Sequence, residues 1–336
     1  MTIRNPYSVL KPSLPAKLIG ICLLLGCAAV AQRIPDVERL RSRAQAGYVE
    51  DQIELARVFK FGLGVPPSPE ESAQWLLKAA NLGSPEAQTG VGYAYFTGSG
   101  VPKDEQAAFK WFQRAAAADY PEAENDLGLV LIYGAGTKPD LSRGVEWITK
   151  AARQGYARAE LDMGLFYALG IGMRQDESQA ARWTHLAVKK HYATAEFFLG
   201  TLYEAGRGVP QDLSKAAHWY RIASDRGFVP AQEYLSRMYA DGAGVPQDSA
   251  LAYFWACIAR KGFGSQSKRL SPERIKQLRG NVAPERALDI ESQAADWIPK
   301  HPNKDEESEV GSSMADLPAE IRGQAQAAAK ALWPHQ

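Results

Sequence analysis

The sequence predicts an all-α solenoid of six stacked helix pairs, because three residue positions return together every 36 residues. The first is a tryptophan, found at Trp75, Trp111, Trp147, Trp183, Trp219 and Trp255. The second is a glycine thirteen positions earlier, at Gly62, Gly98, Gly134, Gly170, Gly206 and Gly242. The third is another glycine two positions further on, from Gly64 to Gly244. Neither helices nor strands have such a period, so the repeating unit is a supersecondary one that stacks on copies of itself.

Length and charge narrow the class of protein. The chain has 336 residues, 39 of them basic and 38 acidic, and a formal net charge of +1. It contains no basic run interleaved with aromatic residues, so we expect no nucleic-acid partner. The period runs unbroken over one elongated array, which divides into units at 48–83, 84–119, 120–155, 156–191, 192–227 and 228–263.

Residues 1–31 have the pattern of a signal peptide. Basic residues and no acid precede a short apolar stretch from Leu18 to Val30, which is too short to span a bilayer comfortably. Two cleavage sites fit. Ala29-Val30-Ala31 suits ordinary signal peptidase, whereas Leu24-Leu25-Gly26-Cys27 resembles a bacterial lipobox, in which Cys27 would be lipidated. The mature protein is expected to have no transmembrane helix and to be periplasmic, either soluble or held at the outer membrane by an N-terminal lipid.

The first helix of each pair, helix A, is clearest in the second unit. Residues 32–47, with a charged helical pattern, are expected to cap the first unit. Ser84-Pro85-Glu86 then predicts a helix start, because serine caps the N-terminus, proline suits the first turn and glutamate complements the helix dipole. The helix should end near Thr97, because Gly98 can adopt the positive φ of a helix C-cap.

The second helix, helix B, has its own start signal. An aspartate recurs as its N-cap at Asp104, Asp140, Asp176, Asp212 and Asp248. The first unit instead has Ser68-Pro69-Glu70-Glu71, a capping box with proline at the first helical position. Helix B carries the tryptophan and, four residues later and therefore on the same face, an alanine.

Helix A also contains a glycine in its middle, where each costs about 0.5–1 kcal/mol relative to alanine. These glycines are Gly92, Gly128, Gly164 and Gly200. A cost repeated four times indicates close packing, and we expect the tryptophan ring of helix B to lie over the bare backbone of helix A.

The repeat ends after Trp255. Ser271-Pro272-Glu273 opens another helical pattern, and residues 264–300 are expected to form one or two capping helices. Residues 301–336 are expected to form a disordered acidic linker and a short tail helix over Leu317 to Trp333.

The combined motif resembles a known family. The motif consists of Ala87, Val91-Gly92, Tyr95, Gly98-x-Gly100-Val101-Pro102, Asp104, Ala108, Trp111-Phe112 and Ala115-Ala116. It is similar to the Sel-one-like repeat, a subclass of the tetratricopeptide superfamily. The resemblance implies antiparallel helix pairs wound into a right-handed superhelix, with the A helices on the concave side. It also implies non-catalytic adaptor or scaffold work in bacterial envelopes and signalling.

A variable stripe on helix A is the candidate binding site. Its positions are spaced i, i+4 and i+7, so they share one face. The stripe is apolar in the middle units, at Tyr93, Phe96, Leu129, Ile132, Leu161, Leu165 and Phe197. It is charged at the ends, at Arg57, Lys60, Glu204, Glu233 and Arg237. These residues predict a groove for a protein or peptide partner. The alternative is that they pack into the next repeat.

No grouping of residues indicates catalysis. The chain lacks H-E-x-x-H, G-x-S-x-G, a phosphate-binding loop and C-x-x-C, and its five histidines are scattered. We therefore expect no catalytic residue, no metal and no cofactor. One cysteine-rich secreted subgroup of the resembled family is associated with penicillin binding or β-lactam hydrolysis. That alternative requires a cysteine pair in each repeat, and Cys257 is the only cysteine of this array. A structural part in an envelope polysaccharide-export complex is a further alternative.

Overall fold

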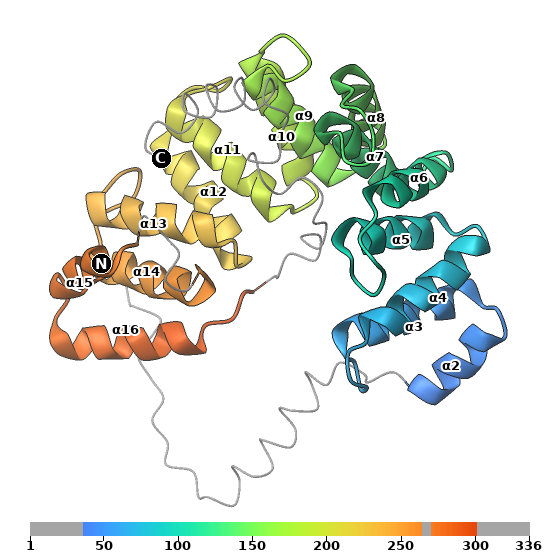
Figure 1. The fold of residues 1–336 in the computed structure, drawn as a ribbon. Coiled ribbons are helices and arrows are strands. Elements are labelled where there is room, and N and C mark those ends of the chain that lie inside the picture. The colour runs from blue at the N-terminus through green and yellow to red at the C-terminus, as the bar shows by residue number, and fades with distance from the viewer. Residues whose placement is uncertain (1–35, 264–269, 301–336) are drawn as a thin grey trace, which may run out of the picture.

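The computed structural model describes residues 36–263 and 270–300, and within them it contains fifteen helices and no strand (Figure 1). The predicted signal peptide with Cys27, the linker and the tail helix lie outside the described residues. Successive helices follow an open arc (Figure 1). From α2 to α15 each helix packs on the next along the chain, as stacked helix pairs require. The prediction of an all-α solenoid is confirmed.

Six helix pairs form the array. The A helices are α3 (Val49–Phe61), α5 (Pro85–Thr97), α7 (Pro121–Tyr133), α9 (Ala157–Leu169), α11 (Ala193–Ala205) and α13 (Val229–Asp241). The B helices are α4 (Pro69–Asn81), α6 (Glu105–Ala116), α8 (Leu141–Arg153), α10 (Glu177–Val188), α12 (Leu213–Asp225) and α14 (Ser249–Phe263).

Three further helices cover the two ends of the array. Helix α2 (Val37–Gln45) brings Val37 and Leu40 against the apolar cluster that contains Trp75. At the other end α15 (Pro272–Gly280) and α16 (Pro284–Asp296) pack on α14. Terminal repeats have only one neighbour, and these helices supply the missing contact.

The helix ends follow the predicted signals. The hydroxyl of Ser84 accepts a hydrogen bond from the backbone N–H of Ala87 at 3.2 Å, and Asp104 accepts one from Ala107 at 2.9 Å. The glycines that end the A helices are left-handed, with φ between 68° and 77°. The last four A helices instead begin after an aromatic residue that makes no side-chain cap, at Tyr120, Tyr156, Tyr192 and Phe228.

In four of the six Gly-x-Gly segments, the second glycine is required by a backbone contact between repeats. A Cβ at Gly136 would overlap the backbone carbonyl oxygen of Glu105, the first residue of the preceding helix B. Gly100, Gly208 and Gly244 stand in the same relation to the preceding helix B. This turn therefore rests directly on the previous repeat, and a side chain would force the two apart.

The prediction for the tryptophans is wrong by one residue. A Cβ at Gly92 would lie 2.7 Å from the ring of Phe112, which follows Trp111. The residues that follow Trp147, Trp183 and Trp219 cover the other mid-helix glycines in the same way, and they are Ile148, Thr184 and Tyr220.

The tryptophans pack at the seam between repeats. Trp111 lies against Ala79 and Ala80 of the preceding helix B and against Ala87 and Val91 of its own helix A. Neighbouring helix residues point about 100° apart, so one faces its own helix A and the other faces the previous repeat. Trp75 and Trp255 are buried, while the four between them are half-buried.

Candidate functional site

The A helices of neighbouring repeats contact each other on the inner side of the arc. Helix α5 packs directly on α7, and the hydroxyl of Tyr93 donates a hydrogen bond to Oδ2 of Asp126 at 2.5 Å. Helices at the inner radius of an arc converge, so this contact places the A helices on the concave side. We call the surface that they form the inner surface.

A pocket of about 330 Å³ lies at the N-terminal half of the inner surface. It spans four repeats, because α3, α4 and α5 supply most of its lining, and residues at or just before the starts of α7 and α9 close it. Three of the predicted residues, Arg57, Lys60 and Tyr93, line this N-terminal inner pocket. Sequence reasoning missed four others, Glu86, Tyr120, Glu122 and Tyr156. The recurrence of tyrosine at positions 120, 156 and 192, just before helix A, is the signal that could have found two of them.

A second pocket, of about 620 Å³, lies at the C-terminal half. The predicted residues Glu204, Glu233 and Arg237 line it, together with Arg274 at the start of α15. Arg237 forms an ion pair with Glu204, which also accepts a hydrogen bond from the hydroxyl of Tyr220 at 2.7 Å. The charged ends of the predicted stripe therefore lie in pockets at the two ends of the inner surface.

The apolar middle of the stripe is largely core. Leu129 is 5% exposed, Ile132 1% and Leu161 3%, so these three do not line an open groove. A Cβ at Gly144 of α8 would lie 2.5 Å from Ile132, which shows how closely this side chain packs on its own helix B. The expectation of a groove is corrected for these three residues, and the alternative of packing between helices applies to them.

The rest of the stripe is half-buried, at Phe96, Leu165 and Phe197. The ring of Phe197 lies 5.2–5.4 Å from the rings of Tyr220, Phe228 and Tyr234, measured between centroids. The partly exposed Phe197 is therefore one edge of an aromatic cluster that joins the fifth and sixth repeats.

A cluster of buried charges lies behind the N-terminal inner pocket. Asp126 is fully buried, and Oδ1 of Asp126 and Oδ2 of Asp162 are buried without a hydrogen-bond partner. Burial raises the pKa of Asp126 to about 7, and the carboxylate of Glu122 adds to this shift while Arg158 and Tyr93 oppose it. Burial also raises the pKa of Asp162 to about 6, against the lowering effect of Arg158. One guanidinium thus lies beside two carboxyl groups, and burial makes both of them harder to ionise than a free aspartate.

This cluster predicts a stability that falls as the pH rises. Between about pH 4 and pH 7 the folded chain holds the Asp126 proton more tightly than the unfolded chain, so the stabilising effect is lost as pH passes through about 7. Asp126→Asn cannot ionise. Relative to the unmodified protein, its free energy of unfolding should be about 1–3 kcal/mol higher at pH 8 than at pH 5.

Urea unfolding followed by circular dichroism at pH 5 and pH 8 measures both values. Asp296→Asn, at an exposed position at the end of α16, is the matched control and should behave as the unmodified protein does. A loss of stability in Asp126→Asn at both pH values would show that the carboxylate is ionised and needed.

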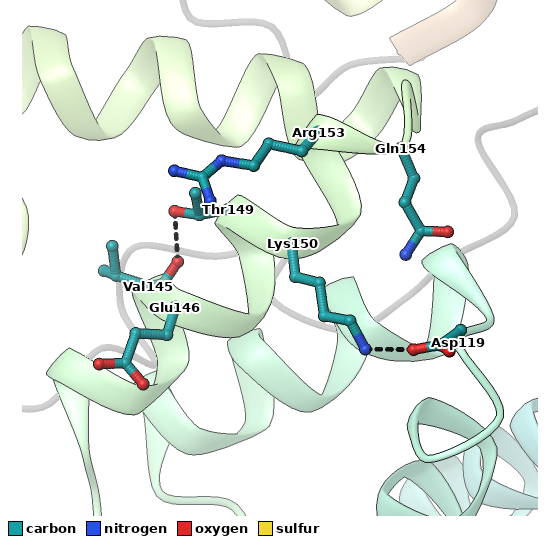
Figure 2. A pocket seen from close by; sticks show the side chains of 7 residues that line it. All are labelled: Asp119, Val145, Glu146, Thr149, Lys150, Arg153 and Gln154. Atoms are coloured by element: carbon teal, nitrogen blue, oxygen red, sulfur yellow. Dashed lines mark hydrogen bonds and ion pairs between the residues drawn. The ribbon is translucent and has the colours of Figure 1, made fainter.

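Lys150 of α8 forms ion pairs that join two repeats on the outer side of the array. Figure 2 shows Lys150 Nζ reaching the carboxylate of Asp119 at 2.5 Å, and Nζ also lies 2.7 Å from Oε1 of the buried Glu124. Gln154 donates to the other oxygen of Glu124 at 2.6 Å. The cavity of about 660 Å³ around these residues is lined mainly by α8. Its lysine is already engaged by two carboxylates, so we interpret this region as structural.

Other chemistry has little support among the residues that the structure describes. No group of three or more His, Cys, Asp or Glu residues there is placed to hold a metal ion. Burial raises the pKa of the half-buried Cys257 thiol, which disfavours a reactive thiolate. None of the helices in residues 36–263 and 270–300 is long and apolar enough to cross a membrane.

Comparison with family models identifies the protein family to which the repeats belong. The Sel1 repeat model matches six times, at residues 49–84, 85–120, 121–156, 157–192, 193–228 and 229–261. This chain belongs to the Sel1 repeat family. The match covers more than half of the residues, and it confirms the resemblance inferred from the motif.

Solved structures agree with the assignment to the Sel1 repeat family. A Sel1 repeat protein from Oxalobacter formigenes is 32% identical with a TM-score of 0.62, over 68% of this chain and 100% of that one. The c5321 protective antigen of uropathogenic Escherichia coli, which displays an SLR fold, is 26% identical with a TM-score of 0.57, over 77% of this chain and 64% of that one. A search of the curated proteins gave no match.

Proposed function

We propose that this Sel1 repeat protein is a non-catalytic scaffold that binds a protein or peptide partner on its inner surface. The observation that carries the proposal is the position of the two inner pockets. Residues from four successive repeats line the N-terminal one, so an extended segment lying across the A helices would contact several repeats at once. Solenoids commonly present binding surfaces of this kind, because their curvature makes an extended concave face.

Site-specific photocrosslinking tests this proposal. A benzophenone amino acid placed at Lys60, on the inner surface, should capture the partner in cells. The same substitution at Lys110, an exposed lysine on the outer helix α6, is the matched control and should capture none. Crosslinking from position 110 and not from position 60 would place the binding surface on the outside and overturn the proposal.

We further propose that the protein works in the bacterial envelope, as a periplasmic protein or as a lipoprotein anchored at Cys27. The support is the basic and then apolar pattern of residues 1–31. The mass of the mature N-terminus distinguishes the routes. A chain that begins at Gln32 indicates ordinary signal peptidase, and a lipid-modified Cys27 indicates anchoring. A cytoplasmic chain that still carries Met1 would contradict both.

A further inference from the structure

We propose that the N-terminal inner pocket binds a lysine or arginine side chain, presented by an extended segment of the protein partner. This inference rests on the proposed function and names the chemistry of one contact. Three tyrosine side chains, Tyr93, Tyr120 and Tyr156, line the pocket together with the carboxylates of Glu86 and Glu122. Aromatic rings and carboxylates are the two kinds of group that bind cationic side chains in proteins.

One of the two positive charges that line the pocket is paired with carboxylates on its own wall. Arg57 Nη1 lies 2.6 Å from Oε2 of Glu54, and Nη2 lies 3.7 Å from Oε1 of Glu86. Lys60 Nζ lies 5.0 Å from the centroid of the Phe61 ring. Arg57, one of the two cations that line the pocket, is therefore already engaged by two carboxylates.

The facing wall, on α7 and α9, is negative. Glu122 accepts a hydrogen bond from the hydroxyl of Tyr120 at 3.1 Å, and Asp126 lies directly behind Tyr93. Asp162 adds a third carboxyl group, while Arg158 is the cation that both aspartates share. With Glu54 and Glu86, five carboxyl groups lie in and around the pocket beside three cations, and because burial raises the pKa of Asp126 and Asp162 the negative excess near neutral pH is smaller than this count.

Two tyrosines that line the pocket lie near the same carboxylates. The pKa values of Tyr120 and Tyr156 are raised, first by burial and then by the carboxylate of Glu122, with Asp126 acting in the same direction. A hydroxyl whose ionisation is opposed by nearby charge lies in a negative potential. The same potential attracts a cation and repels an anion.

The volume and position of the pocket fit one side chain of a partner rather than a whole small-molecule ligand. A volume of about 330 Å³ is at the lower limit of small-molecule sites, and it is open to the inner surface that an extended segment would cross. A partner lysine or arginine would place its apolar stem along the tyrosine rings and its charge near Glu122.

Fluorescence anisotropy with labelled peptides tests the inference on the mature protein. The probe is a nonapeptide of glycine and serine that carries three arginines. Two comparison peptides replace the arginines by neutral citrulline or by glutamate. At low salt the arginine peptide should bind at least about tenfold more tightly than either comparison peptide.

Variants locate the binding. Glu122→Gln should weaken binding of the arginine peptide by about tenfold, and Tyr156→Leu by several-fold. Glu146→Gln, on the outer helix α8, is the matched control and should leave it unchanged. Melting temperatures verify that each variant is folded. If Tyr156→Leu is not folded, the result for Glu122→Gln alone decides the test.

Three outcomes would overturn the inference. They are equal binding of the arginine and citrulline peptides, preference for the glutamate peptide, and undiminished binding by folded Glu122→Gln. If the arginine peptide does not bind at concentrations up to about 1 mM, the inference is overturned in the same way as by equal binding of the arginine and citrulline peptides. None of these affects the photocrosslinking result, so the proposed function and the chemistry of this pocket can fail separately.

Discussion

Gly136→Ala is expected to lower the free energy of unfolding by more than about 3 kcal/mol. Two costs add together. The backbone at Gly136 is left-handed, with φ of +69°, which costs an alanine about 1 kcal/mol, and the new methyl group would overlap the carbonyl oxygen of Glu105. Because this carbonyl belongs to the preceding repeat, relief requires the two repeats to separate, and the damage extends beyond one turn.

Gly83→Ala separates the two costs. Gly83 is also left-handed, with φ of +98°, but a Cβ there would meet no atom within 4 Å. Gly83→Ala should therefore lower the free energy of unfolding by only about 1 kcal/mol. Urea unfolding of both variants measures the difference. Equal losses would mean that backbone conformation alone explains the second glycine of the repeat, and that the contact between repeats is unimportant.

Phe112→Ala should cost about 3–5 kcal/mol, the usual range for removing a buried phenylalanine. Its ring is fully buried, lies on the bare backbone at Gly92 and meets the Tyr93 ring edge-on at 5.4 Å between centroids. Trp111→Ala, one residue earlier, should cost less because this indole is half-buried against small alanine side chains. Thermal and urea unfolding give the order of the two. A larger loss for Trp111→Ala would mean that the indole, and not the residue after it, carries the packing of the pair.

The sequence was sufficient to predict the helix pairs because their signals are local. Ser84 and Asp104 cap the helices that follow them, and Gly98 ends helix A in the left-handed conformation. Each of these depends on a few neighbouring residues, and the 36-residue period repeats the evidence six times.

Packing partners were harder to predict, because a constant residue attracts more attention than a variable one. The position after each tryptophan holds Phe112, Ile148, Thr184 and Tyr220 in the middle repeats, so it does not look like a repeated feature. The glycine opposite it is the constant partner, and it accepts side chains of different sizes. The sequence pattern could not show which of two adjacent residues of helix B faces that glycine.

The inner surface was predicted in part. Arg57, Lys60 and Arg237 were placed correctly near its ends, since charged residues at variable positions of helix A are seldom buried. Leu129, Ile132 and Leu161 were misplaced, because the degree of curvature decides whether neighbouring A helices leave a groove or close on each other. The curvature depends on how whole repeats stack on one another, and the residue pattern of a single helix does not determine this.

The central claim is that the A helices form the binding surface. Hydrogen exchange, measured on the complex with the partner that photocrosslinking identifies, tests this claim most directly. Binding is predicted to slow exchange in peptides that cover α3, α5 and the first turns of α7 and α9. Peptides from the outer helices α6 and α8 should exchange as in the free protein. Protection confined to α6 and α8, with α3 and α5 unchanged, would contradict the claim.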